Sequence, residues 1–108
     1  MKFWAGVAFF SIRIYGAASL KDRRHVVRSL LERARNRFNA SAADLGPDAW
    51  DRADLAFACA GSSHQEMTQR IDQLFSFMEK REEEGEFEVM SASREVFSYG
   101  DIQNRASE

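Results

Sequence analysis

Cysteine and long apolar runs are both scarce in this sequence of 108 residues, and each shortage excludes a class of protein. The one cysteine, Cys59, excludes a disulfide within the chain and suits a reducing compartment. No apolar run approaches the roughly 20 residues that a membrane-spanning helix needs. The apolar stretch at residues 3–15 lacks a small-residue cleavage pattern and is rich in aromatic and β-branched residues, so it indicates a strand rather than a signal peptide. We therefore expect a cytoplasmic protein without a membrane segment.

Motifs for catalysis and metal binding are equally scarce. The two histidines, His25 and His64, belong to different predicted helices, and neither is spaced with Cys59 as zinc ligands are. No glycine-rich loop has the pattern of a phosphate-binding fingerprint. The sequence therefore predicts no metal, no cofactor and no catalytic residue, and we expect a protein that is not an enzyme. A small enzyme or ligand-binding domain stays as an alternative that no constellation of residues supports.

Apolar periodicity is what the chain does have, and it divides the sequence into six elements. Residues 3–15 alternate with the period of a strand, with Phe10 on one face and Phe9 on the other. Ser19 and Asp22 have the spacing of a capping box, which places a helix start there. The expected order is a strand at 3–15, a helix at 19–38, short strands at 39–45 and 53–60, a helix from 62 or 63 to about 84, and a strand at 87–97.

This order predicts an α+β fold. Two βαβ units with right-handed crossovers, and antiparallel pairing of the middle strands, give a ferredoxin-like βαββαβ sandwich with a four-stranded antiparallel sheet. Both helices should cover one face of the sheet and leave the other face open. We expect a single domain over residues 1–97 and a flexible C-terminal tail over residues 98–108, which are polar and lack apolar periodicity.

Two stretches resemble a known family. They are the Ser-Leu-Lys-x-x-Arg segment at residues 19–24 and the Asn-Arg-Phe-Asn segment at residues 36–39 with Ser41. With residues 50–58, they make the chain similar to the YlxP-like family, the bacterial domain of unknown function 503, from about residue 6 to residue 97. The resemblance implies a ferredoxin-like fold. It also implies an RNA-related role, because genes of this family often lie among those for translation factors and ribosome maturation.

Positive charge is concentrated in the first part of the chain. Residues 1–40 hold nine Lys and Arg against two acids, whereas residues 41–108 hold six against fifteen. Seven of the cations fall on the predicted helix at 19–38, and such a cluster suggests a polyanionic partner. On a helical wheel they form two flanks beside the apolar stripe. One flank holds Lys21, Arg24, Arg28 and Arg35, and the other holds Arg23, Arg33 and Arg37.

We therefore expect a non-enzymatic accessory protein that binds RNA or a ribosomal subunit. The predicted nucleic-acid-binding residues are Lys21, Arg24, Arg28, Arg35, Arg37, Asn39 and Ser41. Two alternatives stay open within this hypothesis. The arginines could instead pair with the acidic half of the same chain, and Asn39 could simply be a left-handed helix cap.

The open sheet face supplies the competing hypothesis. RNA-recognition modules of this topology stack bases on several aromatic side chains of the central strands. Here the predicted face offers Phe9 and Arg13 on the first strand, opposite the small residues Ala56 and Ala58. This pattern suits association between sheets as well as base stacking, so a protein-interaction module or a homodimer through Phe9 and Arg13 is the alternative function.

Overall fold

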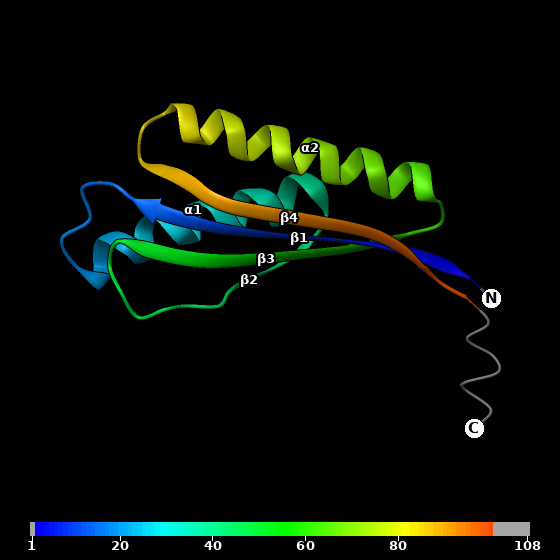
Figure 1. Ribbon diagram of the computed structural model, residues 1–108, viewed down its shortest axis with the longest axis horizontal. Helices are drawn as coiled ribbons and strands as arrows, with labels where there is room; N and C mark the ends of the chain where they lie inside the picture. The colour runs from blue at the N-terminus through cyan, green and yellow to red at the C-terminus, as the bar shows by residue number, and fades with distance from the viewer. Residues whose placement is uncertain (1, 101–108) are drawn as a thin grey trace, which may run out of the picture.

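The computed structural model describes residues 2–100 of the chain. Its six elements follow the predicted order, and both helices lie on one side of the sheet (Figure 1). The bounds are β1 Phe3–Ile14, α1 Leu20–Phe38, β2 Ser41–Asp44, β3 Arg52–Gly61, α2 His64–Glu83 and β4 Phe87–Tyr99.

The four strands form one sheet in the order β2-β3-β1-β4, with every neighbouring pair antiparallel. β1 and β3 are therefore the central strands, and β2 and β4 are the edges. The predicted α+β fold, a βαββαβ arrangement with two helices against one antiparallel sheet, is confirmed. The β1–β4 register shifts between Ser11 and Ile12, which places a bulge in β4 at Met90.

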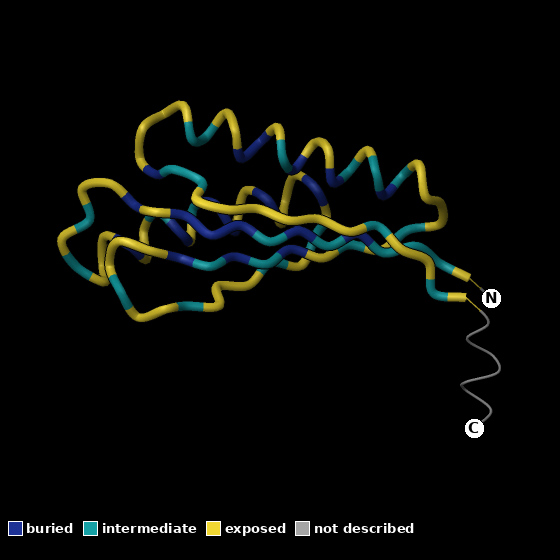
Figure 2. The backbone as a smooth tube through the Cα atoms, viewed as in Figure 1, coloured by how far each residue is buried: buried dark blue, intermediate teal, exposed yellow. Residues whose placement is uncertain are grey.

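The core lies between the sheet and the helices, and period-two alternation in the strands places it there. In β1 the side chains of Phe10, Ile12 and Ile14 are buried, and in β3 Leu55 and Phe57 are buried beside them. Figure 2 shows this alternation of buried and less buried positions along β1 and β3. Because successive strand side chains point to opposite faces, the remaining positions of these strands lie on the face opposite the helices.

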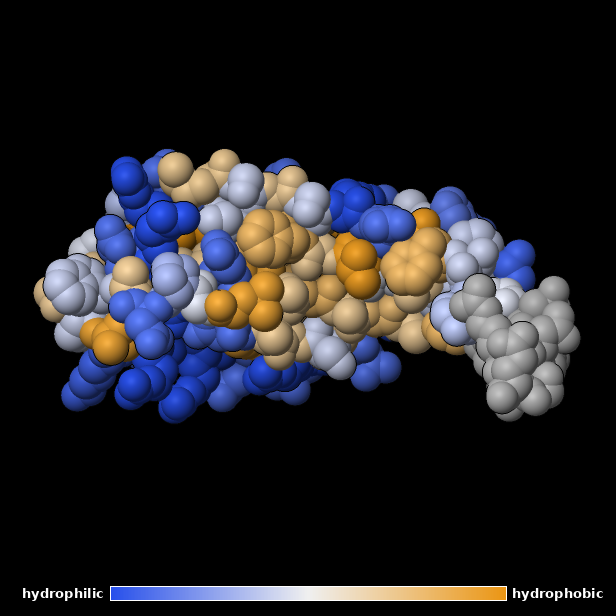
Figure 3. Space-filling model, turned by 60° about the horizontal axis from the view of Figure 1, so that its bottom comes forward, coloured by the Kyte–Doolittle hydropathy of each residue, from blue (hydrophilic) through white to orange (hydrophobic). Residues whose placement is uncertain are grey.

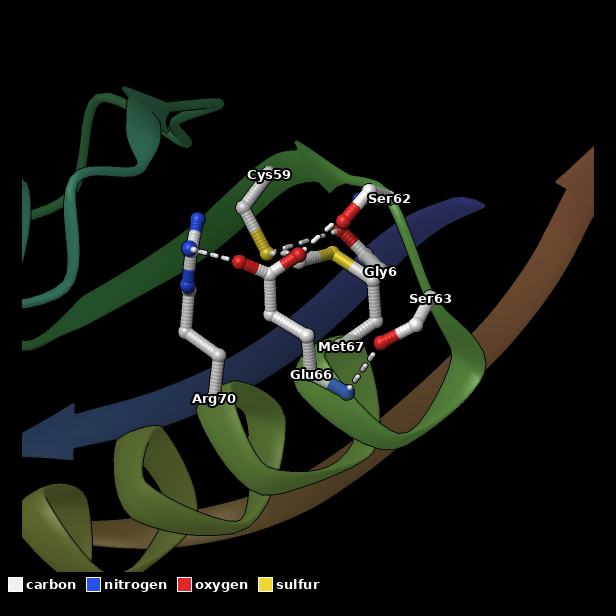
Figure 4. Close-up of polar contacts among 7 residues, drawn as sticks. All are labelled: Gly6, Cys59, Ser62, Ser63, Glu66, Met67 and Arg70. Carbon is white, nitrogen blue, oxygen red and sulfur yellow. Dashed lines mark hydrogen bonds and ion pairs between the residues drawn. The ribbon is translucent and has the colours of Figure 1, made fainter. Parts of the chain in front are cut away.

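Both helices begin at a serine cap, as their sequences predict. Ser19 accepts a hydrogen bond from the Asp22 amide at 3.2 Å, and Ser63 accepts one from the Glu66 amide at 3.1 Å. Figure 4 shows the second cap, where the Glu66 carboxylate also accepts a bond from the Ser62 amide at 2.9 Å. These bonds satisfy amides that a helix start otherwise leaves without partners.

Three details differ from the expectation. Leu20, which has the spacing of the apolar stripe of α1, is 45% exposed because it lies in the first turn, at the margin of the core. Phe75, which is expected in the apolar stripe of α2 from its helical spacing, is only half-buried, whereas Phe77 is buried and packs edge-to-face on Phe38 of α1, with ring centroids 5.6 Å apart. The last strand runs to Tyr99, because it pairs with β1 as far as Phe3. The rest of the predicted tail, residues 101–108, lies outside the described residues.

Candidate nucleic-acid interface

Arg23 is the one cation of α1 that the structure buries. Its side chain is 9% exposed, and Nη1 and Nη2 donate to the two oxygens of Asp44 at 2.7 and 2.9 Å. Its Nε donates to the carbonyl of Arg52 at 2.8 Å. A bidentate pair of this kind is strong and directional, and here it fastens α1 to β2 and β3. Arg23 therefore has a structural role, and its placement on a solvent-facing flank of the helix is wrong.

The same pair changes the acidity of its carboxyl group. The hydrogen bonds from Arg23 lower the pKa of Asp44, and the hydrogen bond from the Gly46 amide lowers it further, while partial burial opposes both. Asp44 is thus ionised in the folded protein and committed to Arg23. Within residues 2–100, Asp44 forms a salt bridge with Arg23 and with none of the exposed arginines of α1.

Four cations lie on one flank of α1, beside its buried stripe. The first of them, Lys21, is near Tyr15 and Gly16 before the helix, and the other three are near β2. All four are exposed, and we call them the basic row: Lys21, Arg24, Arg28 and Arg35. Three of them, with Glu32, line a groove of about 260 Å³ that reaches Asp44 on β2. Arg35 also donates to the Ala42 carbonyl of β2 at 2.7 Å, so this end of the row is held against the edge strand.

None of the basic row forms an ion pair within residues 2–100. In that part of the chain, the only salt bridge of α1 is the one between Arg23 and Asp44. One acid, Glu32, lies beside the basic row, four residues beyond Arg28. It forms no salt bridge with Arg28 in the described chain. The alternative to an exposed site for a polyanion was that the arginines of α1 pair with carboxylates of the same chain. Among the residues that the structure describes, such a salt bridge is present for Arg23 and for none of the basic row.

The opposite flank of α1 has different surroundings. Arg37 borders a hollow between the helices that also contains Lys80, Arg81, Asp72 and Glu84. Arg33 borders another, with Glu84 and Glu86 beside it. This flank faces a surface of mixed charge, so Arg37 is separated from the other predicted phosphate contacts by the width of the helix.

Asn39 and Ser41, the predicted polar partners, do not join the row. Asn39 has φ 50° and ψ 51° and ends α1 in the left-handed conformation, which confirms it as a cap. Ser41 pairs with Ala58 and alternates with Ala42, whose partner Phe57 is buried toward the helices. Ser41 therefore lies on the open face of the sheet.

Phe9 and Arg13 lie on that open face as predicted. Phe9 pairs with Ala56 on β3 and Ser93 on β4, near the middle of the sheet. Arg13 lies near one end of β1, with its guanidinium 4.0 Å from the Glu88 carboxylate. The sequence reasoning missed the aromatic side chains at the other end, where Phe3 stacks on Tyr99 with centroids 5.6 Å apart. The alternation of aromatic and polar residues at Phe97, Ser98 and Tyr99 was the signal that could have indicated them.

Residues 2–100 contain no cluster of three or more His, Cys, Asp or Glu side chains that could hold a metal ion. Cys59, on β3, is half-buried near the start of α2, with Sγ 3.7 Å from both the Met67 sulfur and the Gly6 carbonyl oxygen (Figure 4). In these contacts Cys59 packs as a small apolar side chain. Neither helix is long and apolar enough to cross a membrane, in the part of the chain described.

Comparison with known proteins gives one family and one curated relative. A family model described as "Protein of unknown function (DUF503)" matches residues 5–94. The "Uncharacterized protein YlxP" of Bacillus subtilis (strain 168) is 33% identical over 67 residues, which cover 61% of this chain and 73% of the relative.

Two solved structures resemble the fold only loosely. The "De novo designed protein Foldit4" has a TM-score of 0.45 and 10% identity, and the match covers 90% of this chain and 98% of that protein. The VAO-type flavoprotein MtVAO713 from Myceliophthora thermophila C1 has a TM-score of 0.48 and 15% identity, over 94% of this chain and 20% of the flavoprotein. Neither likeness bears on function. The family match, in contrast, covers most of the chain, and this protein therefore belongs to the DUF503 family.

Proposed function

We propose that this domain is a non-enzymatic accessory protein that binds RNA, or a ribosomal subunit through its RNA, along the basic row. The observation that carries the proposal is that Lys21, Arg24, Arg28 and Arg35 are exposed and form no salt bridge within residues 2–100, while Arg23 beside them is paired with Asp44. Unpaired cations on one flank attract phosphates, and the release of counterions from the nucleic acid supplies affinity.

The row is also long and firmly supported. At a rise of about 1.5 Å per residue, Lys21 and Arg35 are roughly 21 Å apart along the helix axis, enough for several successive phosphates. The Arg23–Asp44 pair and the bond from Arg35 to Ala42 hold α1 against the edge strand at both ends of the row. A preorganised helix loses little backbone entropy when a ligand binds.

Contacts to phosphates recognise the shape of a nucleic acid and do not read its base sequence. Base readout in single-stranded RNA uses stacking on aromatic side chains of both central strands. Here Phe3 and Phe9 lie on β1 alone, and β3 offers alanine at positions 56 and 58 of the same face. We therefore infer a structured RNA as the partner, recognised through its backbone. A cytoplasmic location, which suits both this ligand and the unpaired Cys59, is part of the proposal.

The test is binding to ribosomal subunits and to a structured RNA over a salt series. Wild-type protein should bind at low salt, and log K should fall with log salt at a slope near −0.7 to −0.9 per phosphate contacted, or about −3 for four contacts. The double variant Arg24→Glu/Arg28→Glu should lose binding by about a hundredfold or more, because two contacts become repulsive.

The matched control reverses two charges on the opposite flank of the same helix, Arg33→Glu/Arg37→Glu. Both variants have the same net charge, so a general effect of charge would weaken both equally. We expect the control to lose only a few-fold. Equal losses in the two variants, or no binding by the wild type at low salt, would overturn the proposal.

A further inference from the structure

The face of the sheet opposite the helices is uncovered and largely apolar. Figure 3 shows a band of hydrophobic side chains along this face, bordered by hydrophilic ones. A shallow hollow of about 500 Å³ lies over the middle of it, lined among others by Val7, Phe9, Ala43, Ala56 and Ala58. Monomeric proteins rarely leave a contiguous apolar face of this kind in water, so such a face marks an interaction surface.

Side-chain size changes across this face in a regular way. The strand register aligns two rows that run from β2 through β3 and β1 to β4. The rows are Ser41–Ala58–Val7–Glu95 and Ala43–Ala56–Phe9–Ser93. Each row places alanine on β3 and a bulky apolar residue on β1, and each has a polar residue at one end or both. The face is therefore low over β3 and raised over β1.

We propose that the partner of this face is a second copy of the same chain, related by a two-fold axis that runs parallel to the strands between β3 and β1. Such an axis places β1 of one copy over β3 of the other, so Phe9 covers Ala56 of the second copy and Val7 covers Ala58. The polar ends of the rows then meet, with Glu95 over Ser41. The raised half of each face fills the low half of the other, as a closed isologous dimer requires.

The size of the face is adequate for a stable dimer. With strands about 4.8 Å apart and a rise of about 3.3 Å per residue, the 39 strand residues (12, 4, 10 and 13 in β1 to β4) have a footprint of roughly 600 Å², before the relief of the side chains is added. A standard interface buries about 800 Å² on each partner. Twisted sheets that pack face to face keep their strands within about 30° of each other, which preserves the contacts near the axis.

The dimer is independent of RNA binding. In the arrangement proposed, the two sheets form the centre of a sandwich, and α1 and α2 of each copy remain on its outer surfaces. The basic rows on α1 therefore stay accessible. The two proposals can fail separately, because the residues over the two-fold axis are on β1 and β3.

The test measures molecular mass in solution by light scattering and sedimentation at micromolar concentrations. Wild-type protein should have twice the chain mass of 12.3 kDa. Ala58→Arg, which puts a charge into the centre of the interface at an exposed position, should be a folded monomer by circular dichroism and mass. Gln69→Arg adds the same charge on the exposed side of α2 and should remain a dimer. A monomeric wild type, or a dimeric Ala58→Arg variant, would overturn the proposal.

A second variant separates shape matching from general stickiness. Ala58→Phe makes the face more hydrophobic but fills the low half that receives Val7 of the second copy. Shape matching predicts a dimer weakened by about tenfold or more, whereas nonspecific apolar association predicts a stronger one. Because the interface is apolar, wild-type dimerisation should change little between low and high salt. A tighter Ala58→Phe dimer, or dissociation of the wild type by salt, would contradict this arrangement.

Discussion

At the scale of single residues, neighbouring arginines of α1 have opposite roles. Arg23 is buried and donates three hydrogen bonds, two to Asp44 and one to the Arg52 carbonyl. Arg24 is exposed and forms no salt bridge in the described chain. A helix turns by about 100° per residue, so one position decides whether a side chain faces the sheet or solvent. Similar residues therefore contribute to stability in one case and to the proposed binding surface in the other.

We expect Arg23→Met to lower the free energy of unfolding by about 2 kcal/mol or more, because it leaves the Asp44 carboxylate partly buried without its main partner. Arg24→Met, the matched control one residue along, should change it by less than about 0.5 kcal/mol. Urea denaturation at neutral pH measures both. Equal effects of the two substitutions would contradict the structural role of Arg23.

The same pair predicts a dependence on pH. Asp44 has a pKa below its unfolded value of 3.8, chiefly because of Arg23. A carboxyl group with a lowered pKa contributes stability above its unfolded pKa and loses it as the pH falls through the folded pKa. The gap in unfolding free energy between wild type and Arg23→Met should therefore stay constant from neutral pH to about pH 5 and narrow below the unfolded value. Urea denaturation over a pH series measures it, and a gap that widens in acid would contradict this linkage.

At the scale of elements, each helix depends on a short polar motif at its start. The α2 cap is the more elaborate, since the Glu66 carboxylate also approaches the space above Gly61. A Cβ at Gly61 would lie 2.1 Å from Glu66 Oε1, so a larger residue there would displace the carboxylate from the Ser62 amide. The glycine is thus part of the cap.

We expect Ser63→Ala to destabilise the domain by about 1 kcal/mol, because the Glu66 amide loses its acceptor. Ser62→Ala is the control, since Ser62 contributes through its backbone amide, which alanine retains. Its effect should stay within about 0.5 kcal/mol. Thermal denaturation followed by the helical signal in circular dichroism would show the difference. A larger loss of stability in Ser62→Ala than in Ser63→Ala would contradict the assignment of Ser63 as the cap.

At the scale of the whole molecule, the sheet is unevenly protected. β1 pairs along its length with both β3 and β4, whereas β2 has four residues and pairs with β3 alone. Strands bonded on both sides open mainly when the whole domain unfolds, and short edge strands open by themselves.

Hydrogen exchange should therefore be slowest in the buried centre of β1, around Phe10 and Ile12, and fastest among the paired amides of β2. Adding a structured RNA should slow exchange in β2 and in the adjacent part of α1, because Arg35 bonds to Ala42 of that strand. Exchange followed by mass spectrometry measures both effects. β2 amides as slow as those of β1 in the free protein would contradict this ordering.

The sequence alone determined the six elements, the caps at Ser19 and Asn39 and the faces of Phe9 and Phe10, because alternation and capping depend on residues only a few positions apart. It left the α2 cap open between Ser62 and Ser63, and the structure places it at Ser63. The tertiary structure decided which cations of α1 stay unpaired. Helical spacing places Arg23 in line with Val27 and Leu30 on the buried face, but its partner Asp44 lies 21 residues away, and no local pattern identifies that partner. It also set the register that aligns Phe9 with Ala56, on strands separated by α1 and β2. Ion pairs and register arise between segments that are distant in sequence, so only the folded chain specifies them.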